Sequence, residues 1–290
     1  MTIDQQIEKL GRAKLLGYFD HDSDEWHEAR KGVAGSLVGT LMGHNPWRSA
    51  YTAYYEYLGE LPRDSAPSMA MKLGTVFEQP IQDLWVSENS DWLTAHNTGT
   101  WASVSEPRFK ANPDAIIEWA DGSLGILEIK FSRNPMNELP PHYKDQVMWY
   151  MHVLGLEKGI LVAVANGEMV EHEIEYDQDY ALELVDKAYD FLMCISMQEA
   201  PDWDGSNSTY ETVRTLSEHI HDGDIELGDL YPQLMRAKEI AEETEQAFTL
   251  LKSKVLHLMD GVKVGLYQGD KVLSLQARGS GLPFIVFKRG

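Results

Sequence analysis

Residues 112–132, NPDAIIEWADGSLGILEIKFS, constrain the fold more than any other stretch of the chain. Two apolar runs flank a turn sequence, which is the pattern of a β-hairpin in a protein core. Three charged residues, Asp114, Glu128 and Lys130, interrupt these runs, although buried strands rarely carry unpaired charges. Because alternate side chains of a strand face opposite ways, Glu128 and Lys130 share one face. The hairpin therefore brings charge into a region that is otherwise apolar.

The length of the turn decides where Asp114 lies. A two-residue turn at 121–122 would pair Asp114 with Ile129, on the opposite face of the hairpin. A three-residue turn at 120–122, ending in a left-handed glycine, pairs Asp114 with Glu128 instead. We predict the three-residue turn, which sets two carboxylates side by side with a lysine two residues further on.

Two adjacent carboxylates repel each other, so something must compensate their charge. A divalent cation is the usual solution, because Mg²⁺ prefers one or two carboxylates together with water and phosphate oxygens. Such an ion could activate water for attack on a phosphodiester, and Lys130 could hold that water or the developing charge. The alternative is an exposed strand face with a surface ion pair. The dipeptide Pro113-Asp114 and the buried composition of both strands favour the metal site.

Hydrophobic periodicity predicts helices on both sides of these strands. The predicted helices span 3–16, 23–30, 37–43 after Ser36 as cap, 49–59, 68–88, 142–155 and 177–198. The stripe expected to be buried on the 68–88 helix consists of Phe77, Ile81, Leu84 and Trp85. Further strands are predicted from about residue 92 and around the Asn166-Gly167 turn, over 159–165 and 168–176. This order indicates an α/β (α+β) core, a central mixed β-sheet flanked by helices.

The C-terminal third has a different pattern. Residues 201–228 are rich in Asp, Ser, Asn and Gly and are predicted to form a long connection. Residues 230–258 carry a heptad seam, typical either of a coiled coil or of a helix packed against its own domain. We expect a first domain over 1–200, the connecting segment, and a C-terminal appendage over 229–290 made of the long helix and a basic β-hairpin with a third strand.

The net charge of −21 argues at first against nucleic acid, because phosphates reward cationic surfaces. Its distribution weakens that objection. Residues 161–261 alone carry −17, whereas residues 262–290 carry +4. An acidic segment that faces away from the substrate would leave the opening hairpin and the basic tail free to meet an anion.

The single cysteine, Cys194, excludes an internal disulfide, a cysteine-based zinc site and a four-cysteine iron-sulfur cluster. It lies in an apolar run and is predicted to be a small buried hydrophobe. No apolar run reaches 18 residues and the N-terminus lacks an apolar signal core, so we expect neither a membrane span nor export, and a cytoplasmic protein.

Several motifs in order resemble one protein family. Asp114 followed by Glu128-Ile129-Lys130 resembles the PD-(D/E)xK nuclease motif. WHEARKGVAGSLVGTLMG, from Trp26, resembles the W-x-x-x-R-x-G-x-x-x-S opening of the λ exonuclease and YqaJ-like viral recombinase branch. LGTVFEQPI resembles its R-G-x-x-x-E-P helix, although a leucine replaces the arginine and a glutamine is inserted before the proline. DQVMWYMHVLG resembles its Q-x-x-x-Y helix. The resemblance covers about residues 24–200 and implies a restriction-endonuclease-like core.

The resemblance implies roles for individual residues. Asp114, Glu128 and the main-chain carbonyl of Ile129 would bind metal, with Glu78 as an additional acid and Lys130 as the catalytic lysine. Gln146 and Tyr150, four residues apart on one helical face, would line the site. Arg30 would hold a terminal 5′-phosphate and Ser36 a nearby phosphate. Lys72 and Lys144 could make further phosphate contacts, although solvated surface is the simpler interpretation. No histidine has metal-ligand spacing.

The resemblance further implies a Mg²⁺-dependent exonuclease, with Mn²⁺ as a possible substitute and no iron-sulfur cluster. It would degrade linear double-stranded DNA from 5′ to 3′ by two-metal hydrolysis and leave 3′ single-stranded overhangs for phage-type recombination. The family assembles as a ring-shaped trimer and works with a single-strand annealing protein. A trimer with residues 161–261 facing outward would reconcile the acidic composition with a DNA channel, and the basic tail could contact DNA or an adjacent subunit.

Two other classes of function remain open at this point. The first is a structure-specific or end-processing endonuclease of the same fold, which would also cut circular duplex. The second is a non-catalytic DNA-end or protein-binding module, or an acidic DNA mimic. The intact set of two acids and a lysine favours an enzyme over the second class.

Overall fold

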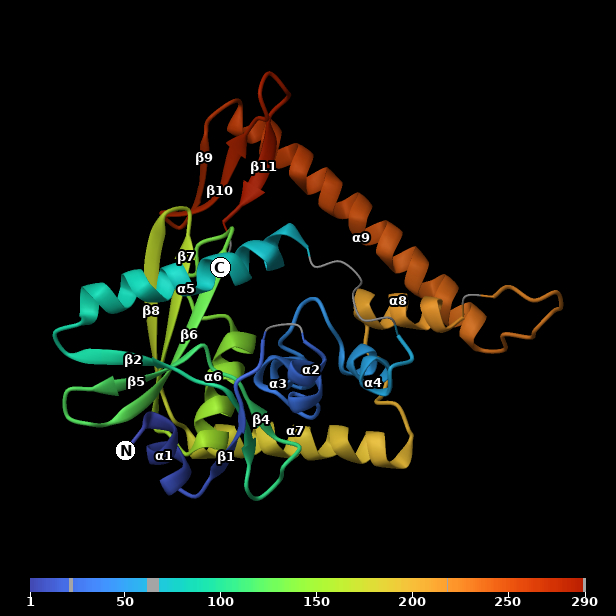
Figure 1. The fold of residues 1–290 in the computed structure, drawn as a ribbon. Helices are drawn as coiled ribbons and strands as arrows, with labels where there is room; N and C mark the ends of the chain where they lie inside the picture. The colour runs from blue at the N-terminus through green and yellow to red at the C-terminus, as the bar shows by residue number, and fades with distance from the viewer. Residues whose placement is uncertain (21–22, 62–67, 218, 289–290) are drawn as a thin grey trace. The chain divides into compact units, whose positions relative to one another are not determined.

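A computed structural model describes residues 1–20, 23–61, 68–217 and 219–288. The chain forms two compact units, Met1–His219 and Ile220–Gly290. A mixed five-stranded sheet organises the first unit (Figure 1). In spatial order its strands are β2 (Leu93–Asn97), β5 (Ala115–Trp119), β6 (Leu124–Ser132), β7 (Lys158–Ala165) and β8 (Glu168–Glu175). Only the pair β6 and β7 is parallel. The predicted fold class, a mixed central sheet flanked by helices, is confirmed.

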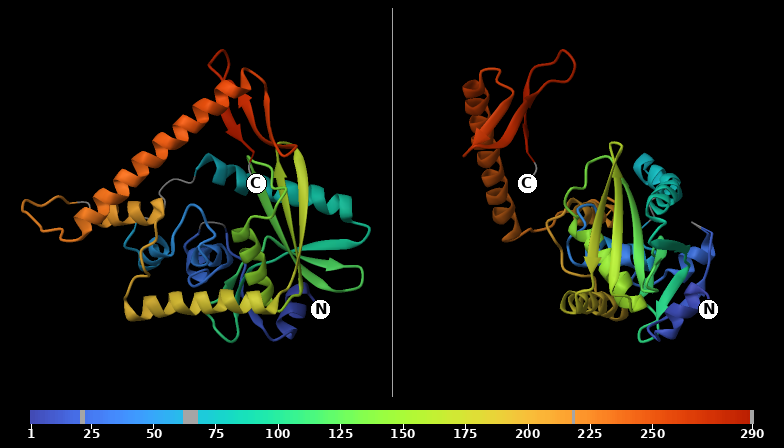
Figure 2. Two further views of the ribbon diagram at one scale, coloured as in Figure 1. Left: turned by 180° about the vertical axis from the view of Figure 1, so that it is seen from behind. Right: turned by 90° about the vertical axis from the view of Figure 1, so that its left-hand side faces the viewer.

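The two faces of this sheet carry separate hydrophobic clusters. Helix α5 (Met69–Asn89) covers one face, where Ile81 and Trp85 pack against Leu127 and Ile129. Helix α6 (Pro141–Leu154) covers the other face and is itself covered by α3 (Gly35–Leu41) and α7 (Gln178–Met197), as Figure 2 shows. The even-numbered positions of β6 face α6, so its two charged residues point into the side of the sheet that carries the larger core.

The remaining elements of the first unit pack around these layers. They are α1 (Ile3–Lys9), α2 (Asp24–Ala29), α4 (Ala50–Leu58), α8 (Asn207–Leu216) and a small antiparallel sheet of β1 (Ala13–Gly17), β3 (Thr100–Ser103) and β4 (Lys110–Ala111). The small sheet lies against α6, where the Trp149 indole donates to the Lys110 carbonyl at 2.9 Å.

The hairpin between β5 and β6 has the register that the sequence predicted. Ala115 pairs with Leu127 and Glu118 with Leu124, so the pairing continues to Asp114 opposite Glu128. Gly122 has a φ of 81°, the left-handed value that the three-residue turn requires, and its N–H donates to the Trp119 carbonyl. The second hairpin is also confirmed, with left-handed Asn166 and Gly167 between β7 and β8.

Three local predictions were wrong. Residues 13–16, predicted as the end of a helix, lie in β1, because Gly11 with a φ of 73° follows the chain's first helix and the next residues pair with β3. Ser36 is not a cap, since α3 begins at Gly35 with Ala34 at the N-cap, two residues earlier than predicted. Of the stripe predicted on α5, Ile81 and Trp85 are buried, whereas Phe77 and Leu84 are 39% and 52% exposed.

The predicted connection at 201–228 contains a helix, α8. Its Thr209 hydroxyl donates to Ser49, at the start of α4, at 2.9 Å, and the Thr52 hydroxyl lies 2.8 Å from that of Thr212. These hydroxyl contacts are polar but buried, so neither hydrophobic periodicity nor composition indicates them. The helix belongs to the first unit.

The second unit consists of α9 (Leu230–Met259) and an antiparallel sheet in the order β11 (Phe284–Phe287), β10 (Asp270–Gln276) and β9 (Val264–Tyr267). The Phe248 and Phe287 rings stack at 6.0 Å between their centroids. Phe248, a member of the heptad seam, therefore contacts the unit's own sheet, whereas Leu251 and Leu258 further along the seam are exposed.

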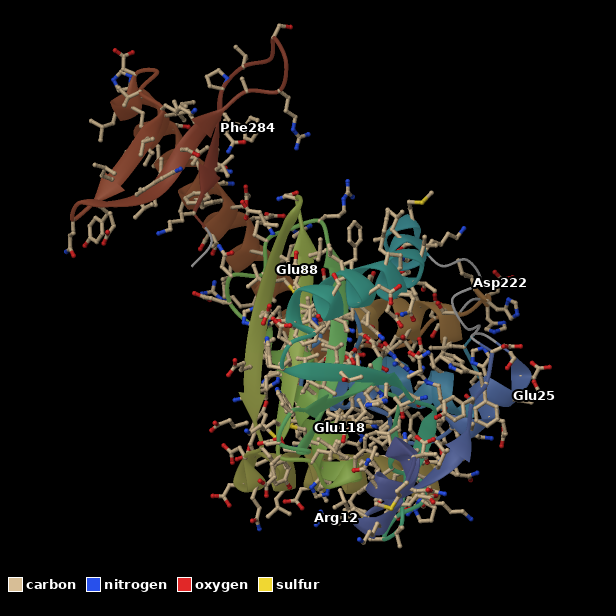
Figure 3. All side chains as sticks on the ribbon, turned by 60° about the vertical axis from the view of Figure 1, so that its left-hand side comes forward. Arg12, Glu25, Glu88, Glu118, Asp222 and Phe284 are labelled. Atoms are coloured by element: carbon tan, nitrogen blue, oxygen red, sulfur yellow. The ribbon has the colours of Figure 1, made fainter. Side chains whose placement is uncertain are left out.

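Charge at the surface follows the sequence distribution. Within 161–261 every acidic residue that the structure describes is exposed. Figure 3 shows this for Asp222, and for Glu25 and Glu88 elsewhere on the surface. No helix in the described part of the chain is long and apolar enough to cross a membrane.

Candidate active site

Strand β6 places Glu128 and Lys130 on the face that meets α6. The Glu128 side chain is 1% exposed, and its Oε1 atom accepts from Lys130 Nζ at 2.5 Å. The lysine side chain remains 20% exposed, so it lies between the buried carboxylate and solvent. The Glu128 end of the ion pair is thus buried and the Lys130 end is accessible to solvent. A site that receives a substrate requires such an open end.

Asp114 lies one residue before β5 and completes the pair of acids. Its Oδ2 atom accepts from the Ile129 N–H at 2.7 Å, a bond that continues the strand pairing through a side chain. In an extended strand the N–H and the carbonyl of one residue point to the same side. The Ile129 carbonyl is therefore directed toward the strand end where Asp114 sits, which is compatible with its predicted role as a ligand.

Helix α6 contributes an amide that orients Glu128. Gln146 Nε2 donates to Glu128 Oε1 at 2.6 Å and to the hydroxyl oxygen of Tyr150 at 3.1 Å. Both α6 residues are buried, and the interior position follows from the approach of α3: a Cβ added to Gly35 would lie 2.5 Å from the Tyr150 ring. Of the predicted pair on one helical face, Gln146 thus contacts Glu128 directly, and Tyr150 contacts Gln146.

The carboxylate of Glu128 has one oxygen without a partner. Oε1 accepts both donors, whereas Oε2 is buried and makes no hydrogen bond. A buried carboxylate oxygen without a partner is costly, and a cation ligated there would remove that cost. The donors present are hard oxygens, the type that Mg²⁺ and Mn²⁺ prefer. The residues therefore fit a divalent ion, with Glu128 Oε2 and Asp114 as its carboxylate ligands.

The ionisation of the acids shows the same shortage of positive charge. Burial, followed by the nearby charge of Asp114, raises the pKa of Glu128 to about 8. Burial also raises the pKa of Asp114, against the opposing effects of Lys130 and the Ile129 N–H. Desolvation acts against the charge of Lys130, but Glu128 and Asp114 outweigh it and raise the lysine pKa. One lysine is insufficient for two buried acids.

Glu78, on α5, approaches from the other side of the strand ends. The residue as a whole is exposed, yet partial desolvation of its carboxyl group and the charge of Asp114 raise its pKa to about 7. In the described part of the chain no three Asp, Glu, His or Cys side chains are already gathered as a metal cluster. Glu78 is thus a neighbour of the two acids, and its predicted role as a ligand remains a prediction.

Arg30 and Ser36 lie at the start of the helical layer beside α6. Arg30 is the C-cap of α2, and its guanidinium lies 4.0 Å from the centroid of the Trp26 ring. Its charge lowers the pKa of Glu78, Asp114 and Tyr150 relative to burial alone, so it is within electrostatic range of the site. Ser36 is exposed on the first turn of α3. Both positions allow the predicted phosphate contacts.

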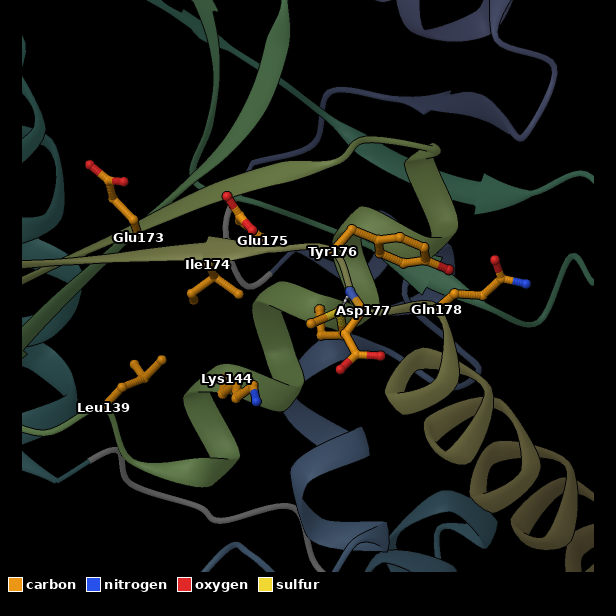
Figure 4. A pocket seen from close by; sticks show the side chains of 9 residues that line it. Leu139, Lys144, Glu173, Ile174, Glu175, Tyr176, Asp177 and Gln178 are labelled. Carbon is orange, nitrogen blue, oxygen red and sulfur yellow. Dashed lines mark hydrogen bonds between the residues drawn. The ribbon is translucent and has the colours of Figure 1, made fainter.

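The two weaker candidates have no place in the acid cluster. Lys72 is exposed on the first turn of α5. Lys144 is exposed on α6 with its ammonium 4.7 Å from the centroid of the Tyr180 ring. Lys144 also lines a hollow of about 900 Å³ beside β8 and α7 (Figure 4). Three of the residues lining that hollow, Glu173, Glu175 and Asp177, are acidic, so it is unsuited to a phosphate backbone.

Sequence reasoning missed Asp145, the residue next to Gln146. It is fully buried, and its carboxylate is held by His44 Nδ1 at 2.8 Å and by the Tyr180 hydroxyl. It connects α6 to the loop between α3 and α4 and to α7. A charged residue inside an apolar helix was the available signal, but its partners are 101 and 35 residues away and follow no short-range pattern.

Residues 25–157 match the family model described as the YqaJ-like viral recombinase domain. The matched region spans somewhat less than half of the chain. It contains most of α2, the acid pair, Lys130 and α6, and the family resemblance predicted from the motifs is confirmed.

Two curated relatives and one solved structure agree with this assignment. An uncharacterised YqaJ protein of Bacillus subtilis is 26% identical over 88% of this chain and 84% of its own length. The CRISPR-associated exonuclease Cas4 of Saccharolobus solfataricus is 34% identical over 32% of this chain and 45% of its own. An alkaline exonuclease from Laribacter hongkongensis matches with a TM-score of 0.51 and 19% identity over 68% of this chain and 99% of its own, which establishes a shared fold.

Proposed function

We propose that this YqaJ-like protein is a divalent-metal-dependent DNA exonuclease. The observation that carries the proposal is the state of Glu128: one carboxylate oxygen is held by Lys130 and Gln146, and the other is buried, unpartnered and beside Asp114. The family, the similarity to Cas4 exonuclease and the fold shared with an alkaline exonuclease support the same reaction class.

The residues divide the work of phosphodiester hydrolysis as follows. Asp114, Glu128 and the Ile129 carbonyl would hold the metal, with Glu78 close by; a bound ion supplies an activated water and neutralises charge on the phosphate. Gln146 fixes the orientation of Glu128 through its 2.6 Å hydrogen bond. Lys130 remains an ammonium beside Glu128 and stabilises charge that develops on the reacting phosphate.

The finer substrate assignment extends the family resemblance. We propose that the preferred ion is Mg²⁺ and that the enzyme degrades the 5′-ended strand of linear duplex DNA, with Arg30 and Ser36 at the terminal phosphate. The product would be a 3′ overhang used in recombination, handed to a single-strand annealing protein. A homotrimer around DNA would turn the exposed acids of residues 161–261 away from the substrate.

Digestion of end-labelled linear duplex tests metal need, activity and direction together. We expect release of label from the 5′ end with Mg²⁺ and none with EDTA. Glu128→Ala and Lys130→Ala should each lower the rate by at least about 10²–10³-fold while circular dichroism stays unchanged. Cleavage of covalently closed circular duplex at a similar rate would instead identify an endonuclease. Undiminished digestion by either variant would overturn the proposed site.

A further inference from the structure

An exposed tryptophan lies at the end of a row of aromatic rings that starts at the catalytic lysine. Lys130 Nζ is 5.2 Å from the centroid of the Tyr143 ring, whose centroid is 4.1 Å from that of His142. The His142 centroid is in turn 5.5 Å from that of Trp47, and the two planes are nearly perpendicular. The distance from Lys130 Nζ to the centre of the Trp47 ring therefore cannot exceed the sum of these three distances. That sum corresponds to about four base steps along a DNA strand, at roughly 3.4 Å each.

Trp47 is 71% exposed, although a large aromatic side chain gains free energy from burial. Among the described residues its aromatic contact is the edge contact with His142, and much of the ring is open to solvent. His142 itself has a buried Nε2 atom without a hydrogen-bond partner. The outer end of the row therefore has an aromatic face that is open to solvent and a polar atom that lacks a hydrogen-bond partner.

Hydrogen bonds tie the loop that carries Trp47 to the helices beside it. The Trp47 N–H donates to Asn45 Oδ1 at 2.9 Å, and Asn45 Nδ2 donates to the Thr40 hydroxyl at 3.1 Å. Fully buried Asp145 anchors the same loop through His44. An aromatic side chain presented in a fixed position loses little conformational freedom when a ligand stacks on it.

We propose that Trp47 is a base-stacking platform that holds an unpaired base of the DNA end within a few nucleotides of the scissile phosphate. The inference rests on the proposed nuclease function and adds a substrate-positioning residue to it. Every base has an aromatic face, so the platform would bind DNA ends without regard to sequence. It contributes affinity without positive charge, which suits a chain of net charge −21.

Kinetics on linear duplexes with single abasic sites test the proposal, with the full chain in Mg²⁺. The abasic site is placed at each of the first five positions from the 5′ end, in one series on the cleaved strand and in another on its complement. For Trp47→Ala on intact DNA we expect KM to rise roughly 5- to 100-fold, with a smaller change in kcat. Trp47→Phe should retain most of the wild-type KM.

Stacking predicts a specific loss of additivity. One abasic position should raise the KM of the wild type and leave that of Trp47→Ala unchanged, because the base and the indole are then already apart. The strand in which that position falls identifies the source of the base. Trp203→Ala is the matched control, since Trp203 is 74% exposed and its ring contact is with Tyr51, outside this row.

Two outcomes would overturn the platform: Trp47→Ala with a wild-type KM, or abasic effects that multiply with the effect of the substitution. Equilibrium binding of fluorescent duplex ends, with Ca²⁺ in place of Mg²⁺, separates this result from failure of the nuclease assignment. If the wild type cuts no DNA but Trp47→Ala still weakens DNA binding at least fivefold, the stacking proposal is supported and the nuclease proposal is refuted. If the wild type does not bind DNA, both proposals are refuted.

Discussion

Replacing Gly35 by alanine would push a methyl group into the residues that orient Glu128. An added Cβ would lie 2.5 and 2.8 Å from two carbons of the Tyr150 ring and 3.0 Å from Gln146 Cγ. Carbon atoms in contact prefer about 3.5–4.0 Å, so each of these contacts is too short. Tyr150 is 1% exposed and cannot turn away without displacing the core around it. Either α3 or Gln146 must therefore move.

Overpacking of this kind costs about 1–3 kcal/mol. Gly74→Ala is the matched control, because Gly74 also lies in a helix but a Cβ there meets nothing within 4 Å. At about 2–4 °C per kcal/mol for a unit of this size, Gly35→Ala should unfold roughly 2–12 °C below the control in differential scanning calorimetry. Movement of Gln146 would also disturb its 2.6 Å bond to Glu128 and lower kcat at least about tenfold.

Equal unfolding temperatures for Gly35→Ala and Gly74→Ala would refute the close packing of α3 on α6. A lowered unfolding temperature with unchanged kcat would refute a different step, the dependence of Glu128 on Gln146. Measuring both quantities on both variants therefore tests the packing and its catalytic consequence separately.

Three further predictions follow from single contacts. Burial and the charge of Asp114 raise the pKa of Glu128 to about 8, so Mg²⁺ binding at pH 7 should release protons and become stronger as the pH rises. Calorimetric titration of Mg²⁺ in two buffers of different ionisation enthalpy measures the proton release, and equal heats in the two buffers would contradict it. Tyr180→Phe should cost about 1–3 kcal/mol in chemical denaturation, because it removes a donor from the buried Asp145 carboxylate, whereas Tyr189→Phe at an exposed ring should be neutral. Gly122→Ala should lower the free energy of unfolding by about 1–3 kcal/mol, because a φ of 81° disfavours a side chain. Gly205→Ala is the control, since Gly205 has open space around it and no positive φ; equal stabilities of the two variants would count against the predicted turn.

The acid pair was predictable because both of its determinants are local. The period of two along β6 assigns Glu128 and Lys130 to one face, and the turn at Gly122 sets Asp114 opposite Glu128. These rules operate over fewer than about twenty residues and do not depend on what packs against the hairpin. The sequence therefore contains the reason for the site's core geometry, independently of any family resemblance.

The parts that sequence reasoning missed depend on distant partners. Strand β1 is defined by pairing with β3, some 90 residues away, and a short amphipathic run is equally compatible with a helix. Helix α8 is attached through buried hydroxyl groups, which hydrophobic periodicity does not register. Asp145 and the loop of Trp47 depend on contacts among α3, α6 and α7 that exist only after these helices have packed.

The electrostatics of the site also resolve the conflict between an acidic chain and a polyanionic substrate. Asp114, Glu128 and Glu78 bring three negative charges when ionised, and Lys130 and Arg30 bring two positive ones within range. These five side chains together then carry one net negative charge. A divalent ion on Glu128 Oε2 changes this to one net positive charge. A phosphodiester would then be attracted where the ion is bound and repelled where it is not. We therefore expect DNA binding at the proposed cleavage position to depend on the metal, whatever the net charge of the rest of the chain.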